Sequence, residues 1–194
     1  MRDRRRLLIG SLAVSAVLSV VVGLVIARSG GTGTADTDSV VIDVDPTFAV
    51  PSIGVNDKVE GTPLPAATVR TLAGDAFETS SLVGQPLVVN IWGSTCGPCK
   101  AELPDLAAAH LRFGDRVRFV GIDYLPPSDA EEQFARDKGI QYELFYDADG
   151  EFITAAGIAT FPVTLFVAPD GTIVEQTGLL DEERIAALVT EHFG

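Results

Sequence analysis

Cysteine and histidine are scarce in this sequence of 194 residues. It contains two cysteines, Cys96 and Cys99, and two histidines, His110 and His192. A structural zinc site takes four ligands at short regular spacings, and these four residues do not have that spacing. A zinc finger is therefore excluded, whereas a metal-binding module that captures copper through the two sulfurs stays open as an alternative.

Basic residues are few outside the N-terminus. Residues 1–28 contain five arginines and one aspartate and therefore carry a net charge of +4. The remaining chain carries −17, which gives the total of −13. Nucleic-acid binding needs a basic face. The acidic body of the chain therefore argues against nucleic acid as a partner.

No charged residue occurs from Leu7 to Ala27, and four arginines precede this stretch. Its 21 residues would span about 31 Å as a helix, close to the thickness of a bilayer core of about 30 Å. Positive charge before such a segment favours a cytoplasmic N-terminus. We therefore expect a single-pass protein of the cell membrane, with its domain outside the cytoplasm.

This interpretation divides the chain into four parts. We expect a cytoplasmic basic tail at 1–6, a transmembrane signal anchor at 7–27, a linker or stalk at 28–60 and a domain at 61–194. A cleaved signal peptide stays open, since Arg4 to Leu8 loosely resembles a twin-arginine export signal. However, the apolar stretch is longer than the 7–15 residues usual in cleaved signals, and no Ala-x-Ala site is evident.

Both cysteines lie in one Cys-x-x-Cys motif between two regular patterns. The apolar run Leu87–Trp92 predicts a buried strand, and the pattern of Ala101–Phe113 predicts a helix. Cys96 then lies at the helix N-terminus, where orphan N–H groups and the helix dipole favour a thiolate. Pro98 is tolerated in the first helical turn because its missing N–H does no harm there.

The motif predicts a dithiol that exchanges with disulfides. Lowering a thiol pKa from about 8.5 to about 7 needs roughly 2 kcal/mol, whereas a helix dipole supplies only about 0.3–1 kcal/mol. Hydrogen bonds from Cys99 to Cys96 must supply the rest. We expect Cys96 to attack and Cys99 to resolve the mixed disulfide, with no bound cofactor or metal. A purely structural disulfide is disfavoured because closing so short a loop stabilises little.

Residues 88–104 read VVNIWGSTCGPCKAELP. This segment resembles the active-site signature of thioredoxin-like proteins, and most closely the membrane-anchored TlpA/ResA/CcmG (DsbE) branch of the redoxin, or AhpC/TSA, superfamily. The resemblance extends over roughly residues 61–194. It implies an α/β thioredoxin fold, with a central mixed sheet, helices on both faces, an N-terminal hairpin and a central helix–strand insertion.

The remaining patterns agree with that fold. A turn at 73–75 predicts a hairpin over 66–79, and Ser128 with Glu131 predicts a capping box that opens the inserted helix. Asp181 is expected to cap the last helix. The other predicted elements are strands at 117–123, 142–146, 163–167 and 172–177 and the inserted helix, which should end at Gly139.

The resemblance also implies residues that support the dithiol. Pro162 corresponds to a cis-proline that faces the cysteines, and the backbone beside it pairs with the substrate chain. Phe161 before it is bulkier than the residue common at that place. Glu102 corresponds to a glutamate near the dithiol, and a buried carboxyl with a raised pKa can take up a thiol proton.

Three further residues near the motif are expected to act indirectly. Asn90 stands where thioredoxin has a buried aspartate, and an amide cannot titrate, which shifts any acid–base role to Glu102. Trp92 is expected to be a core aromatic beneath the site. Thr95 stands where the family commonly has a tryptophan, so the surface beside Cys96 should be less aromatic than in the family.

The function implied by the resemblance is extracytoplasmic thiol–disulfide exchange. The expected partners are protein thiols or disulfides, such as those of apocytochrome c during cytochrome c maturation, and a membrane electron donor of the thiol–disulfide carrier type. A disulfide-forming oxidant stays open as an alternative. So does a thiol peroxidase of the redoxin group, although Ser94 and Thr95 before a Cys-x-x-Cys fit it poorly.

Overall fold

The computed structural model describes residues 55–194. The predicted basic tail, the predicted anchor and the linker up to residue 54 lie outside the described residues. Within residues 55–194, no helix has both the length and the apolar character needed to cross a membrane.

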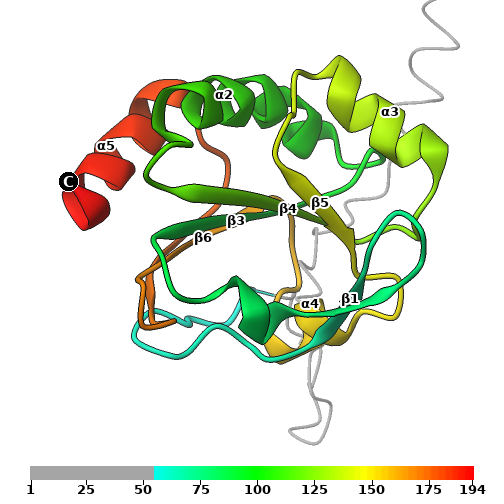
Figure 1. Ribbon diagram of the computed structural model, residues 1–194, viewed down its shortest axis with the longest axis horizontal. Helices are drawn as coiled ribbons and strands as arrows, with labels where there is room; N and C mark the ends of the chain where they lie inside the picture. Colours follow the sequence, from blue (N-terminus) through cyan, green and yellow to red (C-terminus); the bar gives the residue numbers. More distant parts are fainter. Residues whose placement is uncertain (1–54) are drawn as a thin grey trace, which may run out of the picture. The chain divides into compact units, whose positions relative to one another are not determined.

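A mixed sheet of seven strands forms the centre of the domain (Figure 1). The strand order is β2-β1-β5-β4-β3-β6-β7; β3, β4 and β5 are parallel to one another, and the other neighbouring pairs are antiparallel. The strands are β1 (Thr68–Arg70), β2 (Ala76–Glu78), β3 (Leu87–Trp92), β4 (Arg118–Asp123), β5 (Glu143–Tyr146), β6 (Val163–Val167) and β7 (Ile173–Thr177).

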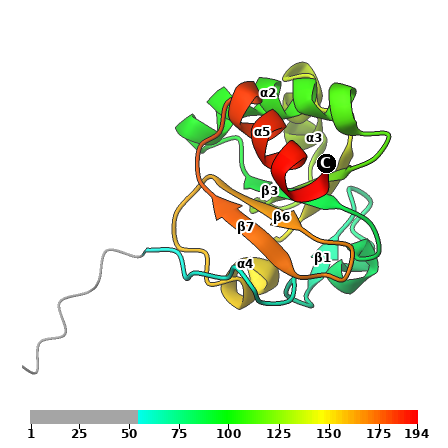
Figure 2. The same cartoon turned by 90° about the vertical axis from the view of Figure 1, so that its left-hand side faces the viewer.

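Helices cover both faces of this sheet, as expected. On one face lie α2 (Gly97–Phe113), α3 (Asp129–Asp137) and α5 (Glu182–Phe193); on the other lie the short helix α4 (Glu151–Ala155) and a 3-10 turn, η1 (Thr79–Leu82). Figure 2 shows α5 on the same side as α2 and α3, with α4 on the opposite side. The inserted pair α3–β5 and the N-terminal hairpin β1–β2 are both present.

Strand β3 lies in the middle of the sheet, and all six of its residues are buried. Val88 and Trp92 pack under α2, α3 and α5, whereas Val89 and Ile91 pack toward α4 and η1. A strand that is covered on both faces is apolar throughout. That double burial accounts for the apolar run before the cysteines.

Two details differ from the sequence-based expectations. Ser128 caps α3 and its Oγ accepts from the N–H of Glu131, but the Glu131 carboxylate does not complete a capping box, because it binds Ser94 instead. The short helix α4 was not predicted at all. Its first-turn N–H groups are satisfied by Asp147, which accepts from Phe152 and Ile153 at 3.1 and 2.9 Å.

The last residues of the predicted linker bond to the domain. Asp57 N donates to Gly157 O at 2.9 Å, and Val59 N donates to Gln176 Oε1 at 3.2 Å. The side chain of Asn56 bonds to the backbone of residues 159–160, just before the cis-proline. Residues 56–60 therefore belong structurally to the domain that follows them.

Candidate active site

The two cysteines form a disulfide at the start of α2. Cys96 is the N-cap residue of the helix and is partly exposed, whereas Cys99 is fully buried. Their sulfurs are 2.05 Å apart, and the Cys99 N–H donates to Cys96 Sγ at 3.1 Å. The hydrogen bond expected from the sequence is therefore present, and Pro98 occupies the first turn as expected.

This placement divides the roles of the two sulfurs. A partner can reach Cys96, since its side chain is partly exposed at the helix N-terminus, where a thiolate is stabilised. Cys99 lies in the core cluster between the sheet and α2, which a partner's sulfur cannot enter. The geometry thus suits a first attack at Cys96 and an internal attack by Cys99.

Glu102 lies one helical turn after Cys99 and is fully buried. Its carboxylate accepts from Asn90 Nδ2 at 2.7 Å and from the backbone N–H of Leu180 at 3.2 Å. Burial raises the pKa of Glu102 to about 7, although these two hydrogen bonds oppose the rise and Asp105 adds to it. A carboxyl group that titrates near neutral pH thus lies on the inner side of the helix that carries the cysteines.

Asn90 connects that helix to the sheet. Its Nδ2 also donates to Thr164 Oγ1 on β6 at 3.0 Å, so the amide joins α2, β3 and β6. Among the described residues, its buried Oδ1 has no hydrogen-bond partner. If the side-chain amide of Asn90 flips, its Oδ1 takes the place of Nδ2 and a protonated Glu102 can donate to it, because an amide has donors at one end and an acceptor at the other.

The peptide bond between Phe161 and Pro162 is cis, as the resemblance implied. Pro162 is buried at the start of β6, and Phe161 is partly buried. Trp92 is fully buried at the end of β3 and stacks on Phe134 of α3 with ring centroids 6.1 Å apart. The expectation that Trp92 is a core aromatic is therefore confirmed.

Two side chains after β4 hold the turn before Cys96: Tyr124 in the loop that follows the strand, and Glu131 in the first turn of α3. Glu131 accepts from Ser94 Oγ at 2.6 Å and from Ser94 N at 3.3 Å. The Tyr124 hydroxyl lies 2.7 Å from Thr95 Oγ1. The loop after β4 and the first turn of the inserted helix α3 therefore fix the position of the cysteine turn.

Asp123, the last residue of β4, is fully buried beside this turn. Burial raises its pKa to about 8, and the nearby Glu131 adds to the rise, while the Leu125 N–H, bonded at 2.8 Å, opposes it. Asp123 and Tyr124 were not predicted from the sequence, and Glu131 was expected only as part of a capping box. The usable signal for Asp123 and Tyr124 was the end of the predicted strand 117–123, because parallel strands end at the same edge of a sheet and this strand pairs with β3 in parallel.

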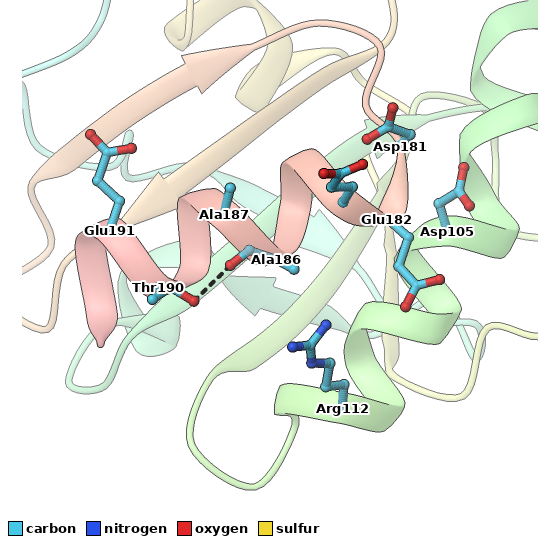
Figure 3. A pocket seen from close by; sticks show the side chains of 9 residues that line it. Asp105, Arg112, Asp181, Glu182, Ala186, Ala187, Thr190 and Glu191 are labelled. Carbon is cyan, nitrogen blue, oxygen red and sulfur yellow. Dashed lines mark hydrogen bonds between the residues drawn. The ribbon is translucent and has the colours of Figure 1, made fainter.

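A groove of about 920 Å³ lies between α2 and α5 (Figure 3). Asp105 and Arg112 reach it from α2, and the other lining residues come from α5 and its cap Asp181. Desolvation, together with the charges of Asp181 and Glu182, raises the pKa of Asp105. Neither cysteine lines this groove, so it is not where exchange takes place.

Among residues 55–194, no group of three or more His, Cys, Asp or Glu side chains is arranged to hold a metal ion. His110 packs edge-on against Phe119 and Tyr142, and burial lowers its pKa.

The model of the AhpC/TSA family matches residues 61–176. The chain belongs to the AhpC/TSA family. Among its relatives in this family is the thiol-disulfide oxidoreductase ResA of Bacillus subtilis (strain 168), which is 28% identical over 128 residues, covering 65% of this chain and 72% of ResA. The thioredoxin-like protein YneN of the same organism is 23% identical over 131 residues, covering 66% of this chain and 74% of YneN.

Solved structures give the same assignment. The structure of MTB DsbF in mixed oxidised and reduced forms is 26% identical, with a TM-score of 0.59, and covers 65% of this chain and 94% of DsbF. The structure of a secreted Mycobacterium tuberculosis disulfide oxidoreductase homologous to E. coli DsbE is 27% identical, with a TM-score of 0.57. The match covers 65% of this chain and 96% of that oxidoreductase. The thioredoxin-like fold and the ResA/DsbE-like branch of the AhpC/TSA family are thereby confirmed. The protein is a thiol–disulfide oxidoreductase with a Cys96–Cys99 pair.

Proposed function

We propose that this oxidoreductase reduces disulfides of exported proteins, with Cys96 as the attacking sulfur. The observation that carries this proposal is the contrast in burial between the two sulfurs, with the Glu102 carboxyl buried one turn further along the same helix. A partner disulfide can reach only Cys96. The proton that the Cys96 thiol releases can be held at Glu102, because the pKa of the Glu102 carboxyl lies near neutrality.

The reduction takes place in two exchanges. The Cys96 thiolate attacks one sulfur of the partner disulfide, which breaks that bond, forms a mixed disulfide and releases the partner's other sulfur as a thiolate. The Cys99 thiolate then attacks Cys96 Sγ, which forms the Cys96–Cys99 disulfide and releases the partner's second thiolate. Two electrons pass from the dithiol to the partner, and a membrane thiol–disulfide carrier restores the dithiol in the same way.

The partner protein in this proposal is apocytochrome c during cytochrome c maturation. The support is the resemblance of residues 88–104 to the TlpA/ResA/CcmG branch and the similarity to ResA. A thiol-alkylating mass-spectrometric assay on cells would test it: loss of Cys96 should leave the haem-binding thiols of apocytochrome c oxidised. If these thiols stay reduced in the Cys96→Ser strain, the partner is another protein.

The proposed location is the outer side of the cell membrane, with residues 7–27 as an uncleaved anchor. The support is the uncharged stretch after the arginine cluster. An alkaline phosphatase fused after Gly194 should be active, and the full-length chain should stay with the membrane after carbonate extraction. A shortened, extractable chain would mean that the segment is a cleaved signal.

The reduction potential separates a reductant from an oxidant. Full-length protein in detergent, equilibrated with glutathione buffers, should give a potential nearer that of thioredoxin, about −270 mV, than that of DsbA, about −120 mV. The Cys96→Ser variant is the control, since it forms no internal disulfide and should give no transition. A potential near that of DsbA would assign the protein as a disulfide-forming oxidant instead.

A further inference from the structure

Tyr124 lies where the active-site loops meet. Its ring lies against the backbone of Gly93, where an added Cβ would come within 2.5 Å of Tyr124 Cζ. Its hydroxyl bonds with Thr95, and its ring packs on Phe161 with centroids 4.5 Å apart and planes inclined by 31°. Tyr124 therefore contacts both the turn that precedes the disulfide and the residue that precedes the cis-proline.

The three segments that meet at Tyr124, residues 93–98, 124–127 and 159–162, contain no charged residue, in a chain with a net charge of −13. Carboxylates border these segments at two points, where Glu131 accepts from Ser94 and Asp123 accepts from Leu125 N. Both aromatic rings are only partly buried, and Thr95, beside them, is exposed. Partly exposed aromatic rings in an acidic protein form a contact surface for apolar side chains.

We propose that Tyr124 and Phe161 form an aromatic ledge beside Cys96 that selects partner proteins by the residue next to the attacked cysteine. This inference rests on the proposed exchange function and specifies its substrate class: protein disulfides flanked by an aromatic or large apolar side chain. To react, the partner's sulfur must come within bonding distance of Cys96 Sγ. Its neighbouring residue must then lie on the surface that the ledge occupies.

The two parts of the tyrosine side chain have separable effects. The ring supplies the contact with an incoming side chain, and aromatic pairs gain enough beyond simple burial to change affinity by up to about tenfold. The hydroxyl, through Thr95, positions the ledge against the turn that carries Cys96. The ring is thus the specificity-determining part, and the hydroxyl the positioning part.

Two synthetic peptide disulfides that differ only in the residue after cysteine, phenylalanine or serine, provide the test. The kcat/KM ratio of phenylalanine peptide to serine peptide is measured for reduced full-length protein. The parent should show a ratio of about ten. Tyr124→Ala should lower the ratio to near one, and Tyr124→Phe should keep most of it because the ring remains.

Leu111→Ala is the matched control. Leu111 is an apolar side chain that is 73% exposed near the far end of α2, and its removal should leave the ratio at the parent value. Because the ratio compares two substrates of one preparation, a partly unfolded fraction cancels from it. A parent ratio near one, or a Tyr124→Ala ratio equal to that of the parent, overturns the ledge but leaves the exchange function standing. Failure of the parent to reduce either peptide overturns both.

Discussion

The Glu102 carboxylate accepts a hydrogen bond from the Asn90 side-chain amide at 2.7 Å, across the interface between α2 and β3. This pair places the titratable group on the helix and a neutral amide on the strand. Both side chains are buried, and burial raises the pKa of Glu102 to about 7. The proton-binding group of the site is therefore carried by the same helix as the two sulfurs.

Replacing Glu102 with glutamine should change how stability depends on pH. The folded protein holds a proton on Glu102 up to about pH 7, whereas the unfolded chain releases it above about 4.5. The free energy of unfolding of the oxidised parent should therefore fall between these pH values, by about 3 kcal/mol from this group. In Glu102→Gln, the free energy of unfolding should not show this decrease of about 3 kcal/mol, as measured by urea unfolding at several pH values.

The oxidised protein suits this measurement because disulfide-bonded cysteines do not titrate. Glutamine can still accept from Leu180 and can donate to Asn90 Oδ1, so the fold should tolerate it. Asp123, whose pKa is also raised, is common to parent and variant and cancels from the difference between them. Parallel stability curves for the two proteins would show that Glu102 does not titrate in this range.

The hydrogen bonds between Ser94 and Glu131 should couple the cysteine turn to α3. We expect Ser94→Ala to lower the free energy of unfolding by about 1–2 kcal/mol, because the hydrogen bond from Ser94 Oγ to the Glu131 carboxylate is lost at a partly buried site, while the bond from the Ser94 backbone N–H can remain. A double-mutant cycle with Glu131→Ala, measured by urea unfolding, should give a coupling energy above about 0.5 kcal/mol. Additive effects would mean that the contact contributes nothing to stability.

Cys96 and Cys99 should differ in reactivity once the disulfide is reduced. Iodoacetamide at neutral pH should label Cys96 first, because it is partly exposed at the helix N-terminus, whereas Cys99 is fully buried. Peptide mapping by mass spectrometry after short exposure gives the order. The Cys99→Ser variant should accumulate mixed disulfides through Cys96, and the Cys96→Ser variant should not. Faster labelling of Cys99 would reverse the assigned roles.

Asn56 should stabilise the loop that leads to the cis-proline. Its Oδ1 accepts from Ala159 N and Thr160 N, both at 2.8 Å, and its Nδ2 donates to Thr160 O at 3.1 Å. We expect Asn56→Ala to cost about 1–2 kcal/mol of stability and to speed amide hydrogen exchange at residues 159 and 160. Asn56→Asp keeps the acceptor and should cost less. Unchanged exchange at both amides would contradict this role.

Elements with local signals could be predicted from the amino-acid sequence. The turn at 73–75, the apolar run of β3, the cap residues Ser128 and Asp181 and the cysteine motif at a helix start each depend on residues close together in the chain. The position of Glu102 agrees with the same local rule, since residues three apart lie on one side of a helix. Its place near the dithiol was expected from the resemblance of residues 88–104 to the TlpA/ResA/CcmG branch.

The side chains that meet at the cysteine turn from distant parts of the chain could not be predicted, because their contacts depend on how the strands pair. Glu131 satisfies the pattern of a capping box, yet its carboxylate binds Ser94, 37 positions earlier, because the parallel pairing of β3 and β4 brings the two segments to one edge of the sheet. Tyr124 and Phe161 meet for a similar reason, since β4 and β6 flank β3 on opposite sides. A local pattern predicts which groups a side chain can bind. Which of these groups lies within hydrogen-bonding distance depends on how the strands pack.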